Sequence, residues 1–268
     1  MPETARLGAR QRKPGRTPLG DAALHVDAAL KVLDDIESCS ELDVKLGGLC
    51  TRLGFDYFSF VLADRHQLGD MTLRTARAGD PMIANSYPKP WRERYGSARY
   101  DRVDPVVTIG SRTRRPFFWG DAEYLRHLSE PRRRVFDEAR DFDIRSGYTV
   151  PLHGPTGECG LFSVSTAGEM SRCEEAVGES RHLLQLIGSQ VYSLVVDRLC
   201  PAAELPELTE HERVCLSWTI RGKTAWEIAQ ILNRSRPTVD FHLQRAIRKL
   251  GAANKVHAAF KALHAGLI

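Results

Sequence analysis

The spacing of apolar residues changes along the chain, and each spacing predicts a type of element. Apolar residues recur at intervals of three or four over residues 21–38 and 41–53, which predicts two helices, the second ending at Gly54. Residues 55–63 (FDYFSFVLA) are aromatic and apolar, and together with residues 71–78 they are predicted strands. The chain therefore begins as a mixture of helices and strands.

The mixed pattern continues to residue 199. Residues 131–142 predict a charged amphipathic helix, and residues 148–152 and 158–166 predict two strands joined by a turn. Residues 173–199 predict a long closing helix. Polar residues interrupt its apolar run, so it is no membrane span and no membrane partner is expected.

Residues 208–268 contain repeated helix-capping signals. Thr209 and Glu212 make a capping box before an apolar run that stops at Gly222, and Thr224 and Glu227 make a second box. Because each box satisfies backbone N–H groups at a helix start, the two boxes predict two short helices in succession.

A third helix is predicted after a turn at residues 233–236. Its apolar residues fall at i, i+4, i+7 and i+11 and form one inward stripe of Val239, Leu243, Ala246 and Leu250. Gly251 ends this helix, and a fourth runs to about His264. Two short helices, a tight turn and a third helix predict an all-α, four-helix domain with a helix-turn-helix.

The face of the third helix opposite this stripe carries groups that can read base edges or hold phosphates. Residues near the starts of the second and third helices are placed for contacts to the DNA backbone. The candidate DNA-binding residues are Lys223, Thr238, Asp240, Gln244, Arg245 and Arg248, with Phe241 on the same face. A small helical dimerisation domain with a solvated basic face is the alternative.

Charge divides the chain at the same place. Residues 208–268 hold ten Lys or Arg and four Asp or Glu, a net charge of +6, whereas residues 21–207 hold 23 and 29, a net charge of −6. Residues 200–207 include two prolines and predict an extended linker. Residues 1–20 carry five basic residues and one acid and predict a disordered basic tail. We therefore expect residues 208–268 to bind double-stranded DNA.

This C-terminal segment resembles the DNA-binding domain of the LuxR family. The resemblance lies in the run LTEHERVCLSW...GKTAWEIAQILNRSRPTVDFHLQRAIRKLGAANKVHAA, where Glu212, Leu216 and Gly222 match an acid, a leucine and a glycine of the family. The GKT at residues 222–224 also resembles the end of a P-loop. Ser217 replaces the first glycine of that motif, so we exclude nucleotide binding there.

Residues 87–107 are dense in aromatic side chains around one acid, Asp104. Trp91 and Tyr95 are one helical turn apart and face the same way. A carboxylate beside Tyr and Trp donors suits a small, mostly apolar ligand with an amide and a carbonyl. Ordinary aromatic core is the alternative interpretation of this cluster.

The region from residue 21 to 199 resembles the autoinducer-binding domain of quorum-sensing LuxR regulators, through YPxxWxxxYxxxxYxxxDPVV, Trp119 and Gly147. The resemblance implies an α-β-α sandwich that holds an N-acyl homoserine lactone between sheet and helices. By position, Trp91 would donate to the lactone carbonyl, Asp104 would accept from the amide N–H, and Tyr95 would donate to the acyl carbonyl.

The resemblance also implies supporting residues around the ligand. A hydroxyl of Ser163, with Ser165 as the alternative, would support the amide, and Tyr87 and Trp119 would pack around the ring and chain. Nearby aromatic crowding indicates either a short, branched or aryl acyl group or ordinary core; it comprises Phe55, Tyr57, Phe58, Phe60, Phe117 and Phe118.

Together the two resemblances imply a cytoplasmic, homodimeric transcriptional regulator. It would bind an inverted-repeat operator, act with RNA polymerase, and take the lactone as its signal, with no other cofactor. A solo regulator that responds to another small molecule, or to none, is the alternative.

An enzyme is not expected, because the sequence has no HExxH, no GxSxG and no clustered histidines, and hence no candidate catalytic or metal-binding residue. A phosphorylated response regulator is excluded because the acids of a receiver domain are missing. Six sparse cysteines without a C-x-x-C indicate a reducing compartment.

Overall fold

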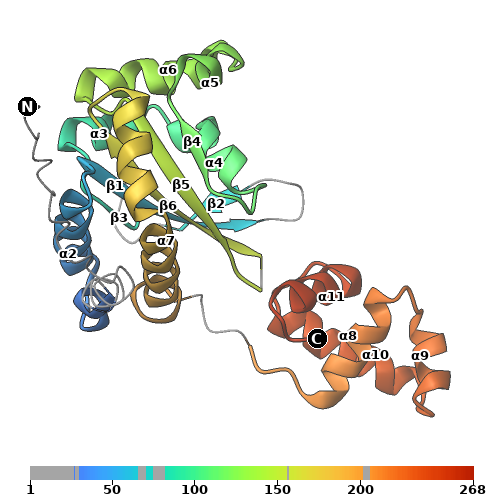
Figure 1. Ribbon diagram of the computed structural model, residues 1–268. Coiled ribbons are helices and arrows are strands. Elements are labelled where there is room, and N and C mark those ends of the chain that lie inside the picture. The colour runs from blue at the N-terminus through green and yellow to red at the C-terminus, as the bar shows by residue number, and fades with distance from the viewer. Residues whose placement is uncertain (1–26, 28–29, 66–70, 75–81, 156, 202–205) are drawn as a thin grey trace, which may run out of the picture.

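One antiparallel sheet organises the N-terminal part of the chain (Figure 1). The computed structural model describes residues 27, 30–65, 71–74, 82–155, 157–201 and 206–268. Within these residues the strands run in the order β2-β1-β6-β5-β4, and β3 pairs with β1. Their bounds are β1 (Tyr57–Arg65), β2 (Met71–Leu73), β3 (Ala84–Asn85), β4 (Phe117–Trp119), β5 (Ser146–His153) and β6 (Glu158–Thr166).

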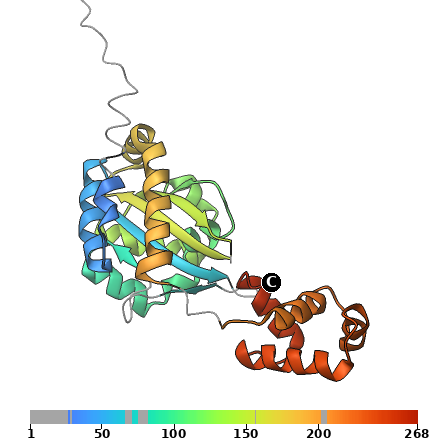
Figure 2. The same cartoon turned by 90° about the horizontal axis from the view of Figure 1, so that it is seen from below.

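Helices cover both faces of this sheet, as Figure 2 shows. Two long helices, α2 and α7, lie on one face, and the shorter α3 to α6 lie on the other. Their bounds are α2 (Cys39–Arg52), α3 (Lys89–Ser97), α4 (Pro105–Gly110), α5 (Ala122–Arg126), α6 (Glu130–Ala139) and α7 (Met170–Leu194). The predicted α-β-α sandwich is therefore confirmed.

Alternation along the central strands produces two separate cores. On β1, Phe58, Phe60 and Leu62 face α2 and α7, whereas Val61 packs beneath the short helices. On β6, Leu161 packs on that second side. Successive strand residues point to opposite faces, so one strand supplies both cores. The second core contains the aromatic residues that the sequence singles out.

Several predicted boundaries differ from the structure. The first predicted helix is helical at residues 30–34, and its end comes early because the side chain of Ser38 accepts a hydrogen bond from the backbone N–H of Glu41 and caps α2. The described residues leave out 21–26 and 28–29 of that predicted helix, the predicted tail at 1–20, residues 75–78 of the predicted strand and residues 202–205 of the predicted linker. Among the described helices, none is long and apolar enough to cross a membrane.

The C-terminal part forms the four predicted helices. They are α8 (Glu210–Ile220), α9 (Ala225–Ile231), α10 (Arg236–Lys249) and α11 (Lys255–His264). Both capping boxes are formed, at Thr209 and at Thr224. All four residues of the stripe on α10 are buried against the neighbouring helices. The predicted helix-turn-helix domain is therefore confirmed, whereas the exact domain bounds 21–199, 200–207 and 208–268 stay predictions.

A buried carboxylate fixes α10 against α8. The side chain of Glu212 has no exposed surface, accepts from the backbone N–H of Thr209 at 2.8 Å, and meets Lys249 Nζ at 2.7 Å. Burial alone would raise the pKa of Glu212, but the hydrogen bonds from Lys249 and Thr209 outweigh it and lower that pKa. A buried charge needs such partners, so Glu212 links the start of α8 to the end of α10.

Candidate ligand pocket and DNA-binding helix

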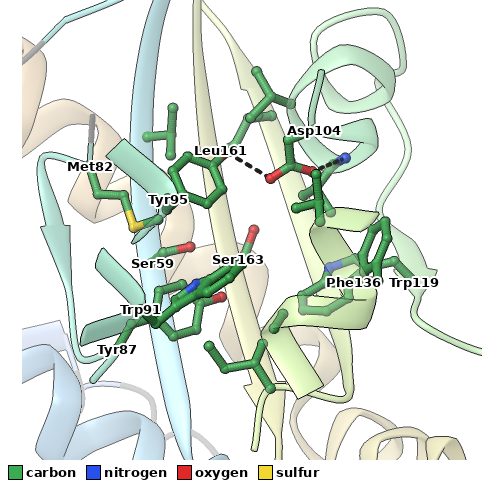
Figure 3. A pocket seen from close by; sticks show the side chains of 16 residues that line it. Ser59, Met82, Tyr87, Trp91, Tyr95, Asp104, Trp119, Phe136, Leu161 and Ser163 are labelled. Carbon is green, nitrogen blue, oxygen red and sulfur yellow. Dashed lines mark hydrogen bonds between the residues drawn. The ribbon is translucent and has the colours of Figure 1, made fainter. Parts of the chain in front are cut away.

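A pocket lies between the sheet and the short helices (Figure 3). Its floor is formed by β1 and β6, and its walls by α3, α4 and α6. Its cavity volume is about 50 Å³, and its lining is mostly apolar and aromatic with a few polar groups, as in small-molecule sites. All six candidate ligand residues line it, namely Tyr87, Trp91, Tyr95, Asp104, Trp119 and Ser163.

Asp104 is the one carboxylate among the described residues that line this pocket. It is the N-cap of α4, where Oδ1 accepts from the backbone N–H of Val106 at 2.8 Å. Its Oδ2 accepts from the hydroxyl of Tyr95 at 2.8 Å, as Figure 3 shows. Pro105 follows in the first helical turn, where its missing N–H costs nothing. Local helix chemistry therefore fixes the carboxylate at the pocket wall.

Burial changes the proton affinity of this group. Asp104 is only 9% exposed, and desolvation raises its pKa to about 6, although the hydrogen bonds from Tyr95 and Val106 oppose the rise. Burial, followed by the nearby charge of Asp104, raises the pKa of Tyr95 well above 10.0. Tyr95 is thus a hydrogen-bond donor, and Asp104 is an acceptor that ionises near neutral pH.

A chain of hydroxyl groups runs across the pocket floor. The indole N–H of Trp119 donates to Thr149 Oγ1 at 2.9 Å, and Thr149 Oγ1 lies 2.8 Å from Ser163 Oγ. Thr149 is fully buried, so the chain is shielded from water. Of the two serines that the sequence left open, Ser163 lines the pocket, and Ser165 is not among its described lining residues.

An ion pair near the surface holds α3, the helix that carries Trp91 and Tyr95, against α6. Arg94 donates from Nε and Nη2 to the two carboxylate oxygens of Glu138 on α6, at 2.7 and 2.9 Å. These hydrogen bonds lower the pKa of Glu138 to about 2, so the pair stays charged at neutral pH. Among the described residues, the indole N–H of Trp91 has no hydrogen-bond partner, so it remains available to a ligand.

The sequence missed the apolar part of the pocket. The additional lining residues share deep burial or contact with the second core, and they are Ser59, Val61, Met82, Val106, Val107, Val135, Phe136, Ala139, Ile144 and Leu161. Ser59 had a usable signal, since it is the one serine inside the largely apolar run FDYFSFVLA. The six crowded aromatic residues are not among the described lining residues, which favours their interpretation as ordinary core. They are Phe55, Tyr57, Phe58, Phe60, Phe117 and Phe118.

The candidate DNA-binding residues fall into two groups. Gln244 and Arg248 are exposed on α10, and no hydrogen bond or ion pair engages them within the described part of the chain. The other four candidates already have partners in the protein. Lys223 pairs with Glu227, Asp240 with Arg236, Arg245 with Glu212, and Thr238 with Ser235.

The exposed face of α10 also carries an aromatic side chain. Phe241 is 54% exposed, and the guanidinium of Arg245 lies 5.7 Å from the centre of its ring. Phe241, Arg245, Arg248 and Lys249 line a shallow hollow on this face. Basic groups beside an exposed aromatic ring suit a nucleic-acid surface.

Comparisons with known proteins agree with both parts of the molecule. Residues 45–194 match the family described as "Autoinducer binding domain", and residues 206–262 match "Bacterial regulatory proteins, luxR family". The transcriptional activator protein VanR of Vibrio anguillarum is 32% identical over 235 residues, which are 87% of this chain and 93% of VanR. The quorum sensing-dependent transcriptional regulator RpaR of Rhodopseudomonas palustris is 34% identical over 254 residues, 93% of this chain and 98% of RpaR.

A solved structure shares the fold. Escherichia coli SdiA superimposes with a TM-score of 0.73 at 23% identity, covering 92% of this chain and 99% of SdiA. A small-molecule domain ahead of a helix-turn-helix defines a ligand-responsive transcriptional regulator rather than an enzyme. The chain belongs to the LuxR family of quorum-sensing regulators that carry an autoinducer-binding domain.

Proposed function

We propose that this regulator binds an N-acyl homoserine lactone in the pocket, pairs as a homodimer, and binds an inverted-repeat operator to control transcription by RNA polymerase in the cytoplasm. The observation that carries the ligand class is Asp104, a buried carboxylate acceptor among apolar walls. An amide N–H matches this acceptor, and an acyl chain matches the walls.

Hydrogen-bond exchange would accommodate the ligand. The hydroxyl of Tyr95 has one proton, and Asp104 accepts it at 2.8 Å. When the ligand amide donates to Asp104, that proton becomes available to the acyl carbonyl. Trp91 would donate to the lactone carbonyl, Ser163 would support the amide, and Tyr87 and Trp119 would pack around the ligand. Each donor and acceptor of the ligand then has a partner.

Exposed apolar side chains support the pairing of two copies. Leu186 on α7 is 45% exposed, and on α11 Val256 and Leu263 are 60% and 51% exposed. Val256 and Leu263 are seven residues apart and lie on one face of the helix. Pairing through these faces would place two α10 helices on half-sites about one helical turn of DNA apart, or a multiple of it. Bound ligand would favour the folded state by RT ln(1 + [L]/Kd).

The direct test compares DNA binding with and without ligand. The full chain is produced in a host without acyl homoserine lactones, and duplexes selected from a random library serve as the operator. We expect added acyl homoserine lactone to strengthen binding to the selected duplex. Equal binding with and without any such lactone would overturn the proposal. A response to octanoyl-rac-glycerol alone, a molecule found with SdiA, would instead support the alternative of a regulator for another signal.

Ligand affinity should depend on pH through Asp104. Its pKa is raised from 3.8 to about 6 in the folded chain, so ionising it costs stability as pH rises through this range. A ligand that donates to the ionised form recovers that cost, and its affinity should rise about tenfold between pH 5 and 7. Calorimetric titration at several pH values measures this.

Replacing Tyr95 with Phe provides the check on this pH dependence. The hydrogen bond from Tyr95 lowers the pKa of Asp104, so its loss should move the rise in affinity to higher pH. A flat profile in the unmodified protein would show that Asp104 is not the acceptor.

A further inference from the structure

The floor of the pocket changes from polar to apolar one step along the strands. Ser163 on β6 lies opposite Ser59 on β1 and Thr149 on β5. The next pair on the same face is Leu161 opposite Val61. Residues two apart along a strand are separated by about 7 Å. The floor therefore offers hydroxyl groups at one level and only hydrocarbon at the next.

This step sets a direction for the ligand. In the proposed function, the amide lies with Asp104 and the hydroxyl level, so an acyl chain avoids unfavourable polar contacts by running toward Leu161 and Val61. Met82 and Val107 line the pocket as well and add to its apolar surface. The amide of the ligand would lie at Ser163, and the acyl chain would contact apolar side chains within about 7 Å of it.

The pocket ends at the level of Leu161 and Val61. The following residue of the same face of β6 is Cys159, which is buried in the second core and is not among the described residues that line the pocket. Leu161 itself is only 1% exposed. Its side chain is thus the last floor residue of β6 that a ligand can contact.

Gly110 gives Leu161 the room to occupy this place. A Cβ atom built on Gly110, at the end of α4, would lie 2.6 Å from Cδ2 and 3.2 Å from Cδ1 of Leu161. The first distance is too short for any real contact, so a side chain at position 110 would displace the methyl groups of Leu161. Gly110 is not a lining residue of the pocket, but it determines where a lining residue lies.

We infer that Leu161, seated against Gly110, is the end wall of the acyl subsite and restricts this protein to short acyl chains. The inference rests on the proposed function and specifies its ligand. A chain of a few carbons spans the distance from the hydroxyl level to Leu161. A longer chain has to displace that side chain, which the sheet behind it and α4 beside it resist.

The test measures the affinity of the full-length protein for four homoserine lactones, which carry butanoyl, hexanoyl, octanoyl and dodecanoyl groups. The unmodified protein should bind the two short ones more tightly. Leu161→Ala should raise the ratio of dodecanoyl to butanoyl affinity by about tenfold or more, because it opens space for additional methylene groups. Leu62→Ala is the matched control, since Leu62 is equally buried but faces the opposite core. It should leave this ratio unchanged, even though it also destabilises the fold.

A second variant tests the role of Gly110. Gly110→Ala should change the same ratio by about threefold in the unmodified background and leave it unchanged in the Leu161→Ala background, where the obstructing methyl groups are gone. An unchanged ratio in Leu161→Ala, or equal binding of all four lactones by the unmodified protein, would overturn the inference that Leu161 ends the acyl subsite. It would leave the proposed function in place. If none of the four binds the unmodified protein, the proposed function and the acyl subsite both fail.

Discussion

Asp104→Asn should weaken ligand binding by about ten- to a hundredfold, because it leaves a buried donor without an acceptor. In the complex the two carboxylate oxygens would accept from the backbone N–H of Val106 and from the ligand amide. An asparagine side chain has one acceptor oxygen with two lone pairs, and its NH2 group is itself a donor. With that oxygen capping α4, the NH2 group would face the amide N–H of the ligand, and two donors would then oppose each other. Calorimetric titration of the full chain with hexanoyl-homoserine lactone measures the loss.

Glu93→Gln is the matched control for this substitution. Glu93 lies on α3, the helix that carries Trp91 and Tyr95, but its side chain is 67% exposed and pairs with Lys89 at the surface. The same change from acid to amide should leave ligand affinity unchanged there. Because Asn can still cap α4 through its oxygen, the folded state should persist, which circular dichroism checks. Unaltered ligand affinity in Asp104→Asn would mean that another group accepts the amide.

The local part of the fold was predictable because its signals are local. The helix-turn-helix domain follows from two capping boxes and one apolar stripe, each contained within a few residues of sequence. In the sheet, the apolar run 55–63 predicts a strand but says nothing of its partner. The register of β1 on β6 arises from pairing between residues about a hundred positions apart. Strand β4 has three residues, too few to show a period.

The polar part of the candidate site was predictable from the family resemblance, and the apolar part was not. Asp104, Trp91 and Tyr95 fall within one short run whose spacing carries the resemblance. Thr149 and Leu161 belong to the site only through the register of β5 and β6, and that register has no signature in either segment. Ligand chemistry could therefore be expected from the sequence, whereas the shape of the acyl subsite needed the structure.

The DNA-binding face shows the same division between local and long-range causes. A helical wheel places Arg245 on the outward face of α10, but it cannot show that Glu212 on α8 lies 3.4 Å away. Asp240, by contrast, pairs with Arg236 at 3.6 Å within α10, a local contact between residues four apart. Arg245 contacts α8 as well as facing outward, so its substitution would confound DNA contact with folding.

Gln244 and Arg248 provide cleaner tests, and we expect different outcomes for them. Gln244 lies in the middle of α10, where side chains of a recognition helix reach base edges, so Gln244→Ala should reduce discrimination between the selected duplex and a random one by about ten- to a hundredfold. Arg248 lies in the last turn, where contacts go to phosphates. Arg248→Ala should weaken binding to both duplexes alike and reduce the salt dependence by about one phosphate contact.

Fluorescence anisotropy with both duplexes at several salt concentrations separates these two outcomes. Gln230→Ala is the control, because Gln230 is an exposed glutamine on α9 rather than on the recognition helix. It should change neither discrimination nor salt dependence. Equal loss for both duplexes in Gln244→Ala would assign this residue to the backbone instead of the bases. A change confined to one duplex in Arg248→Ala would do the reverse, because a phosphate carries no sequence information while a base edge does.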